Sequence, residues 1–376
     1  MESLDGSLHK KFAGIFLKRV CLLREVLPNL DGLTVLHAGP PFVTSDVPAA
    51  VRNATVHALL FEGGVTTPDQ AVNLIDSGKV NFQPAQDWGV VTPLAQVVSP
   101  SMPVFVIGDG ASQMCAPIVE GAPIGIRFGS PEPECLESLR CHADFAVREL
   151  GPLLQKSPVK VAAVIKTALE EGNDCHSLTD QANSAFLGQL EGLSNEYRTL
   201  LENSPGFVLP ILMAAAGWLL QFGPRAPDCS GRVVAAGGNG LQFGIRLSGQ
   251  TEWSTILAQP PEGTLFPNQE GRPVLGSIGD SAVIDFCGLG GQALSQAPSL
   301  VSDWEVLLPK DWSTRPGSVL GPSSGVVCAQ RVTERQLVPI VNLALVSADA
   351  RGGILGKGFY QPDLSLFKAA QARGAL

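Results

Sequence analysis

The spacing of apolar residues changes twice along this chain of 376 residues, and that change constrains the fold more than any other feature. Up to about residue 132, short apolar and β-branched runs alternate with glycine and proline, as in strands of a buried sheet. From 133 to 222 apolar residues recur at helical spacing, and strand-like runs then return. The length also exceeds the usual limit for one hydrophobic core. We therefore expect a multidomain α+β protein in which a helical insert separates two α/β domains.

The two changes in the spacing of apolar residues define the predicted domain boundaries. They give an N-terminal α+β domain over 1–132, a helical domain over 133–222 and a C-terminal α+β domain over 223–376. A short amphipathic helix is expected over 69–77, where Gly78 would end it. The predicted strands are 34–36, 56–61, 90–91, 97–98, 103–109, 233–234, 243–247, 253–258 and 282–286.

The helical part contains a connection with polar side chains. Ser157-Pro158 is a suitable start for a helix and Gly172 a suitable stop, so residues 173–176 should join two helices. Within that connection, Asp174 could orient the imidazole of His176, or it could cap the next helix. The apolar run 207–222 is shorter than the roughly 20 residues that cross a bilayer, so we expect a buried helix and no membrane contact.

Composition excludes some classes of partner. Lys and Arg number 26 against 35 Asp and Glu, a net charge of −9 without a basic run, which argues against nucleic acid. Charged residues make up only 16 % of the chain and hydrophobic residues 45 %, so burial is extensive and a homo-oligomer or complex subunit is expected. The eight cysteines show no paired spacing and predict reduced, mostly buried thiols in a cytoplasmic protein without a secretory signal.

Polar residues flanked by glycine follow several apolar runs, where binding sites of layered α/β proteins often lie. Arg127 and Arg246 both stand in a Gly-Ile-Arg context, and arginine suits a carboxylate or phosphate ligand. Each could instead pair with an internal carboxylate such as Asp280 or Glu62. Asp280-Ser281 could form one wall of a small-molecule site or an ordinary turn.

Two histidines are candidates for proton transfer. His37 precedes a rigid Gly39-Pro40-Pro41 segment and His176 lies in the helix connection, although His37 could equally be a core side chain. The sequence has no paired Cys/His spacing, no nucleophile elbow, no dinucleotide fingerprint and no Gly-Lys-Ser/Thr ending in its late glycine-rich stretch. We therefore expect neither a metal nor a cofactor.

Across roughly residues 30 to 370 the chain resembles the YlbE-like family, whose members are similar to one subunit of oxamate carbamoyltransferase. The matching segments are 36–41, 60–63, 78–82, 101–103, 127–129, 239–240, 243–246, 248–249, 279–282 and 288–291. The resemblance implies phosphorolysis of oxalurate to oxamate and carbamoyl phosphate, or the reverse, in a complex with an FdrA-like partner and other subunits.

The resemblance also implies roles for residues in these segments. Arg127 and Arg246 would hold anionic groups, backbone amides near Gly279 or Gly290 would polarise the carbonyl, and His37 or His176 would transfer a proton. The residues expected to take part in catalysis are His37, Glu62, His176 and Asp280. Those expected to bind substrate are Gly39, Arg127, Asn239, Arg246, Ser281 and Gly290.

The chain departs from the family pattern at several polar positions. Gln86-Asp87 stands where the family tends to have two histidines, and Leu178-Thr179 where it has Arg-Asn. Two hypotheses follow: a carbamoyltransferase subunit acting on a small ureido or oxamate-type acid, or a non-catalytic scaffold or ligand-binding paralogue in the same kind of complex.

Overall fold

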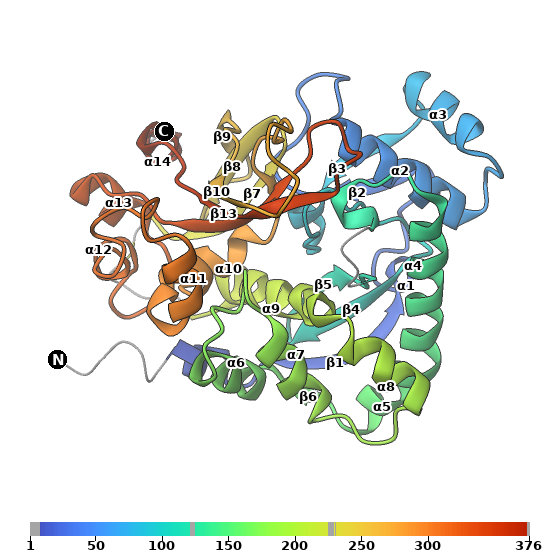
Figure 1. Cartoon of the computed structure of the whole chain (residues 1–376), viewed down its shortest axis with the longest axis horizontal. Coiled ribbons are helices and arrows are strands. Elements are labelled where there is room, and N and C mark those ends of the chain that lie inside the picture. The colour runs from blue at the N-terminus through green and yellow to red at the C-terminus, as the bar shows by residue number, and fades with distance from the viewer. Residues whose placement is uncertain (1–7, 121–124, 225–228, 230, 374–376) are drawn as a thin grey trace.

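The computed structural model describes residues 8–120, 125–224, 229 and 231–373, and it contains mixed helices and sheets (Figure 1). The first sheet has the order β5 (Gln113–Pro117), β4 (Pro103–Gly108), β1 (Phe16–Leu22) and β6 (Val159–Lys160), with antiparallel neighbours. Separately, β2 (Thr34–His37) pairs in parallel with β3 (Asn81–Pro84). The helices α2 (Ala49–Glu62) and α3 (Pro68–Asp76) connect these two strands, as a parallel pair requires.

Two further antiparallel sheets are formed by strands after residue 232. One has the order β11 (Ile278–Gly279), β7 (Val233–Asn239), β8 (Gln242–Leu247) and β9 (Ser254–Leu257). The other has the order β10 (Glu262–Leu265), β13 (Ile354–Tyr360) and β12 (Val341–Val346). The remaining α-helices are α1 (Leu23–Val26), α4 (Pro133–Phe145), α5 (Gly151–Lys156), α6 (Val161–Glu170), α7 (Asp180–Leu187), α8 (Asn195–Glu202), α9 (Leu209–Phe222), α10 (Ala282–Phe286), α11 (Pro298–Asp303), α12 (Pro316–Val319), α13 (Ala329–Arg335) and α14 (Leu364–Arg373).

Helix α9 lies at the centre of the molecule. Every residue from Pro210 to Leu220 is buried, and the helix packs against β4 and β5 as well as against β7 and α10. By length and composition Pro205–Phe222 resembles a membrane span, but 72 % of that window is buried inside the protein. The prediction of a buried helix is therefore confirmed, and the polypeptide has the character of a soluble protein.

The largest hydrophobic core draws on all three predicted domains. Phe105, Phe207 and Phe243 belong to the same cluster, although they come from the three predicted domains. A smaller cluster lies around α2, where Ala50, Ala54 and Ala58 are fully buried. The division at 132 and 222 remains a prediction about domains, whereas the helical character of 133–222 is confirmed by α4 to α9.

Some predicted elements are wrong. Residues 56–61 and 282–286 form parts of helices α2 and α10 instead of strands, because a short buried apolar run has the same composition in either element. Residues 90–91 and 97–98 lie outside the strands and make only isolated bridges, Val90 with Cys115 and Leu36 with Val98. Ser157-Pro158 does not start a helix, since β6 intervenes and α6 begins at Val161.

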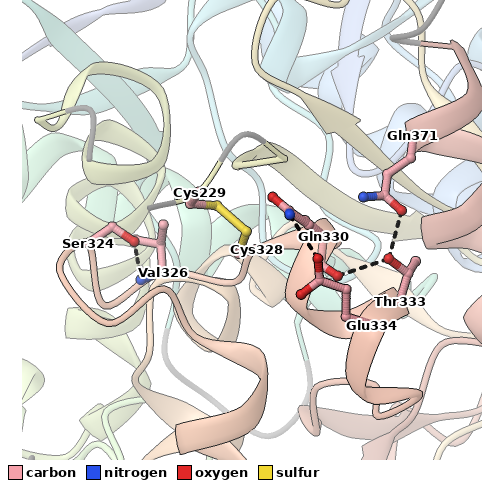
Figure 2. The surroundings of a disulfide bond; sticks show 8 residues. All are labelled: Cys229, Ser324, Val326, Cys328, Gln330, Thr333, Glu334 and Gln371. Carbon is pink, nitrogen blue, oxygen red and sulfur yellow. Dashed lines mark hydrogen bonds between the residues drawn. A yellow bond between two sulfur atoms is a disulfide. The ribbon is translucent and has the colours of Figure 1, made fainter. Parts of the chain in front are cut away.

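Not all cysteines are reduced thiols. Cys229 and Cys328 form a disulfide across 99 residues of sequence, with Cα atoms 5.7 Å apart (Figure 2). Cys328 directly precedes α13, where Gln330 donates a hydrogen bond to Glu334 and Thr333 one to Gln371 of α14. The prediction of reduced cysteines was wrong at this pair because sequence spacing cannot show which distant residues meet. The other cysteines are free, and all of them except Cys141 are buried.

Candidate active site

A cavity of ≈ 150 Å³ lies where the helical part of the chain meets β12, β13 and α10. Its walls come from segments far apart in the sequence, so only the folded chain forms it. The lining residues are Pro93, Leu94, Arg127, Phe128, His176, Ser177, Thr179, Gly206, Leu209, Ser281, Leu343, Ala344, Ile354 and Lys357. Among the predicted site residues, Arg127, His176 and Ser281 meet here.

His176 forms a carboxylate–imidazole dyad with Asp285. Its Nδ1 lies 2.9 Å from Asp285 Oδ2, and the Asp285 side chain is fully buried. Burial lowers the pKa of His176, but the Asp285 carboxylate, its hydrogen bond and the charge of Asp174 outweigh burial and raise the pKa above its ordinary value. Nε2 is neither fully buried nor bonded to any part of the chain that the structure describes. The dyad thus presents Nε2 for proton exchange with a molecule in the cavity.

The dyad is held rigidly from behind. Asp285 Oδ1 accepts hydrogen bonds from the backbone N–H of Gly291 at 2.7 Å and of Asn342 at 2.9 Å. Asp174 does not contact His176 through a hydrogen bond; its carboxylate accepts from Ser177 N, Leu178 N and Asn342 Nδ2. The orienting carboxylate is therefore Asp285, and of the two roles left open for Asp174 the orientation of His176 does not hold. Asp174 instead fixes the loop that carries His176.

Arg127 lies in η4 (Ile126–Phe128) and supplies positive charge to the same cavity. Its guanidinium carbon is 4.7 Å from the centroid of the Phe128 ring, and its charge interacts with the buried Glu120 carboxylate. A Cβ added to Gly206 would lie 2.9 Å from the nearer guanidinium nitrogen. Glycine at 206 therefore leaves the space that the arginine head group occupies.

Ser281 and Asp280 have different surroundings despite being neighbours. Ser281 lines the cavity, and its hydroxyl oxygen is buried without a hydrogen-bonding partner among the described residues. Asp280 lies behind it, where Oδ1 accepts from Gly39 N at 2.9 Å and Gln86 Nε2 at 2.6 Å, and Oδ2 from Thr92 N at 2.9 Å. Burial raises the pKa of Asp280 to about 7, against the lowering effect of these three donors. Asp280 thus ties together segments behind the cavity.

Three other predicted residues lie outside the cavity lining. Arg246 forms an ion pair with Asp87 and stacks over Trp253, so the alternative of an internal partner holds for this arginine. Glu62 accepts hydrogen bonds from the backbone and hydroxyl of Ser101, at 2.6 and 2.8 Å. His37 is buried and stacks on Phe42 with ring centroids 4.3 Å apart. Burial lowers the pKa of His37 to about 4, which keeps it neutral.

The remaining predicted residues use their polar groups within the protein. Asn239 donates from Nδ2 to Pro40 O at 2.9 Å, and the Gly39 N–H binds Asp280. The Gly290 N–H donates to Asp174 O at 2.9 Å, so it is already engaged and does not point to a substrate carbonyl. A Cβ on Gly39 would lie 2.4 Å from Gly238 C. These positions shape the site by close backbone approach.

Sequence reasoning missed Asp285 and Lys357. Asp285 was hidden in a run read as a strand, and it lies 109 residues from its histidine. Lys357 lies on β13 between two glycines and lines the cavity. The sequence signal for Lys357 was its position between two glycines in the glycine-rich stretch 352–358. That stretch lacks the pattern of a phosphate-binding loop. Within the ranges that the structure describes, no group of three or more His, Cys, Asp or Glu residues is arranged to hold a metal ion.

Backbone strain also marks the site. Leu94, which lines the cavity, has φ +49°, and Cys175, next to His176, has φ +68°. Such conformations cost a non-glycine residue on the order of 1–2 kcal/mol and persist where the surroundings enforce them. Leu94 and Cys175 adjoin the walls that carry the candidate chemistry, whereas Asn268, Gln336 and Ala350 have positive φ elsewhere.

Comparison with known proteins agrees with the resemblance found in the sequence. The family model described as oxamate carbamoyltransferase subunit AllG matches residues 80–281, more than half of the chain. The chain is 28 % identical to oxamate carbamoyltransferase subunit AllG of Escherichia coli K12, over 90 % of this chain and 88 % of that protein. It is 26 % identical to the uncharacterized protein YahG of the same strain, over 92 % and 79 % of the two chains.

A solved structure shares the fold. The crystal structure of a conserved protein of unknown function from Enterococcus faecalis V583 superposes with a TM-score of 0.84 at 24 % sequence identity, covering 98 % of this chain and 96 % of that one. At this identity the likeness concerns the fold alone. The family match and the AllG relative carry the assignment further, and the chain belongs to the AllG family as a divergent member.

Proposed function

We propose that this protein is a subunit of a carbamoyltransferase that acts on a small ureido or oxamate-type acid. The reaction would be phosphorolysis of oxalurate to oxamate and carbamoyl phosphate, or a related transfer. The observation that carries the proposal is the His176–Asp285 dyad facing the cavity that also contains Arg127. Membership of the AllG family supports it.

The cavity residues suit the steps of such a transfer. A phosphate oxygen would form a bond to the carbamoyl carbon of oxalurate while the bond from that carbon to the oxamate nitrogen breaks. The departing nitrogen needs a proton, which the Nε2 of protonated His176 would donate, and the reverse reaction would return the proton to Nε2. Arg127 would bind an anionic group of the two substrates, and Ser281 would form part of the wall beside the reacting group.

The other predicted site residues would act at a distance in this proposal. Asp280, Gly39, Asn239 and Gly290 would shape the walls, whereas His37, Glu62 and Arg246 make contacts outside the lining. Because the AllG relative is named as a subunit, we expect other subunits, including an FdrA-like chain, to complete the enzyme. We place the complex in the cytoplasm, and no cofactor is needed for the transfer.

A direct assay tests the proposal. The chain would be combined with the products of its neighbouring genes, and carbamoyl phosphate formation from oxalurate and inorganic phosphate would be measured. We expect turnover in the complete complex and a loss of about 10²-fold or more with His176→Gln, since general acid–base catalysis contributes that much. No turnover in the complete complex would refute the proposal.

The alternative is a non-catalytic scaffold or ligand-binding subunit. It is favoured by Gln86 and Asp87, which engage Asp280 and Arg246 within the protein in place of the two histidines of the family pattern. If the chain were only a scaffold, Arg127→Ala would leave the turnover of the complex unchanged. A large loss with Arg127→Ala, without loss of complex assembly, would exclude that role.

A further inference from the structure

The cavity continues into a wider outer groove of ≈ 370 Å³. Some residues line both hollows, among them Arg127 and Lys357. His176 and Ser281 line only the inner cavity, and Asp180 and Phe266 only the outer groove. The two cations therefore lie where the hollows join, between the outer groove and the dyad.

The position of Lys357 follows from strand register. On the antiparallel pair β12–β13, Lys357 is directly opposite Ala344, so both side chains lie on one face of the sheet. Ala344 lines the same cavity, and its small side chain leaves room beside it for the lysine stem. Gly356 and Gly358 flank Lys357 because a Cβ on either would lie 2.2 Å from a carbonyl oxygen of β10.

One of the charges around the junction, that of Lys357, is not balanced by any residue that the structure describes. Arg127 interacts with the buried Glu120 carboxylate, and His176 is paired with Asp285. Lys357 makes no ion pair or side-chain hydrogen bond with any residue in 8–120, 125–224, 229 or 231–373. Asp180, the acid of the outer groove, instead accepts hydrogen bonds from Asn173 at 3.1 Å and Gln181 at 3.0 Å. In the described part of the chain, the half-buried Lys357 thus has no anionic partner.

We infer that Lys357 and Arg127 form a binding site for a phosphate group at the junction of the two hollows, with Lys357 as the residue that the bound group neutralises. Phosphate carries between one and two negative charges near neutral pH and accepts from several donors at once. Lysine acts as a point charge toward it and arginine as a two-pronged donor. The site deepens the proposed function and rests on it, because it places phosphate beside the cavity that contains Nε2 of His176.

Binding of inorganic phosphate to the purified full-length chain, measured by titration calorimetry at constant ionic strength, tests the site without any turnover. We expect Lys357→Gln to weaken phosphate binding by about tenfold or more, the usual effect of losing one charge-assisted contact. Lys357→Arg should stay within about threefold of the natural protein, because it restores the charge. Lys79→Gln is the matched control, since Lys79 is exposed and does not line either hollow.

The possible results distinguish a failure of the phosphate site from a failure of the proposed carbamoyl transfer. Equal phosphate affinity in Lys357→Gln and the natural protein would refute the site, as would the absence of phosphate binding both by the natural chain and by the complete complex. Lys357-dependent phosphate binding together with no turnover of oxalurate would support the site and refute the carbamoyl transfer. In an active complex, Lys357→Gln should raise the KM for phosphate more than the KM for oxalurate.

Discussion

The chemistry at the residue scale depends on which proton His176 carries. With Asp285 accepting from Nδ1–H, the neutral imidazole has its lone pair on Nε2, which faces the cavity. Because the pKa of His176 is raised, the protonated form persists to a higher pH than in an isolated histidine, and the form that accepts a proton dominates only above that raised pKa. The Asp285 carboxylate thus fixes which nitrogen of His176 exchanges a proton with the cavity.

Asp285→Asn should move the proton of neutral His176 from Nδ1 to Nε2, and it changes the size of the side chain at 285 very little. An asparagine can keep its oxygen toward Gly291 N and Asn342 N while its amide donates to Nδ1, which moves the histidine proton to Nε2. We expect the ¹⁵N shifts of His176 to report protonated Nε2, the pKa of His176 to fall, and turnover to drop about 10²- to 10⁴-fold. Unchanged ¹⁵N shifts would contradict the assigned role of Asp285, and thermal unfolding would serve as the control for folding.

At the scale of elements, α10 and the turn after it hold the dyad in place. Gly290 has φ +54°, and a Cβ there would lie 2.2 Å from Asp285 Oδ1 and 3.2 Å from His176 Cβ. Gly172, at the end of the helix before His176, has φ +87° but its nearest contact would be 3.9 Å away. A side chain at Gly290 would therefore suffer both backbone strain and a steric clash, whereas one at Gly172 would suffer backbone strain alone.

Gly290→Ala should destabilise the protein by about 2–4 kcal/mol, because it combines strain with displacement of a buried carboxylate. Gly172→Ala, which suffers only the strain, should cost about 1–2 kcal/mol. Urea unfolding of the two variants measures the difference. Equal losses would show that the space next to Asp285 is not restricted.

The same elements show what the sequence could predict. Glycine stops and helical spacing located α3, α6 and α9, whose signals are local. The buried run 282–286 has no period that distinguishes strand from helix, so Asp285 was assigned to the wrong element. His176, Arg127 and Ser281 were found as candidates because glycine and polar neighbours mark them, whereas the partners Asp285 and Lys357 depend on contacts between distant segments.

At the scale of the whole molecule, Asp280 connects parts of the chain that are far apart in sequence. Its carboxylate joins the segment after β2 through Gly39, the segment after β3 through Gln86 and Thr92, and β7 through the contacts of Gln86 with Ala236. The cavity wall at Ser281 follows directly after this junction. Stability and site geometry are therefore linked at one buried carboxyl group.

That link predicts how the stability of the whole protein responds to pH. Since burial raises the pKa of Asp280 from 3.8 to about 7, the folded protein retains its proton between about pH 4 and 7 while the unfolded chain has lost it. The stabilisation is fully present below the unfolded pKa and disappears as pH rises through the folded one. Asp280 should thus lower the free energy of unfolding by up to about 1.4 kcal/mol per pH unit across this window.

Asp280→Asn should remove the contribution of residue 280 to the pH dependence, so the free energy of unfolding should change less with pH. The new amide group would also face one of the three hydrogen-bond donors, which should lower the free energy of unfolding at every pH by about 1–3 kcal/mol. The comparison therefore concerns slopes and not absolute values. Urea unfolding from pH 4.5 to 8 measures them, with Asp69→Asn on the exposed face of α3 as the control. If the natural protein and Asp280→Asn had the same slope, Asp280 would remain ionised throughout, and its three hydrogen bonds would outweigh its burial.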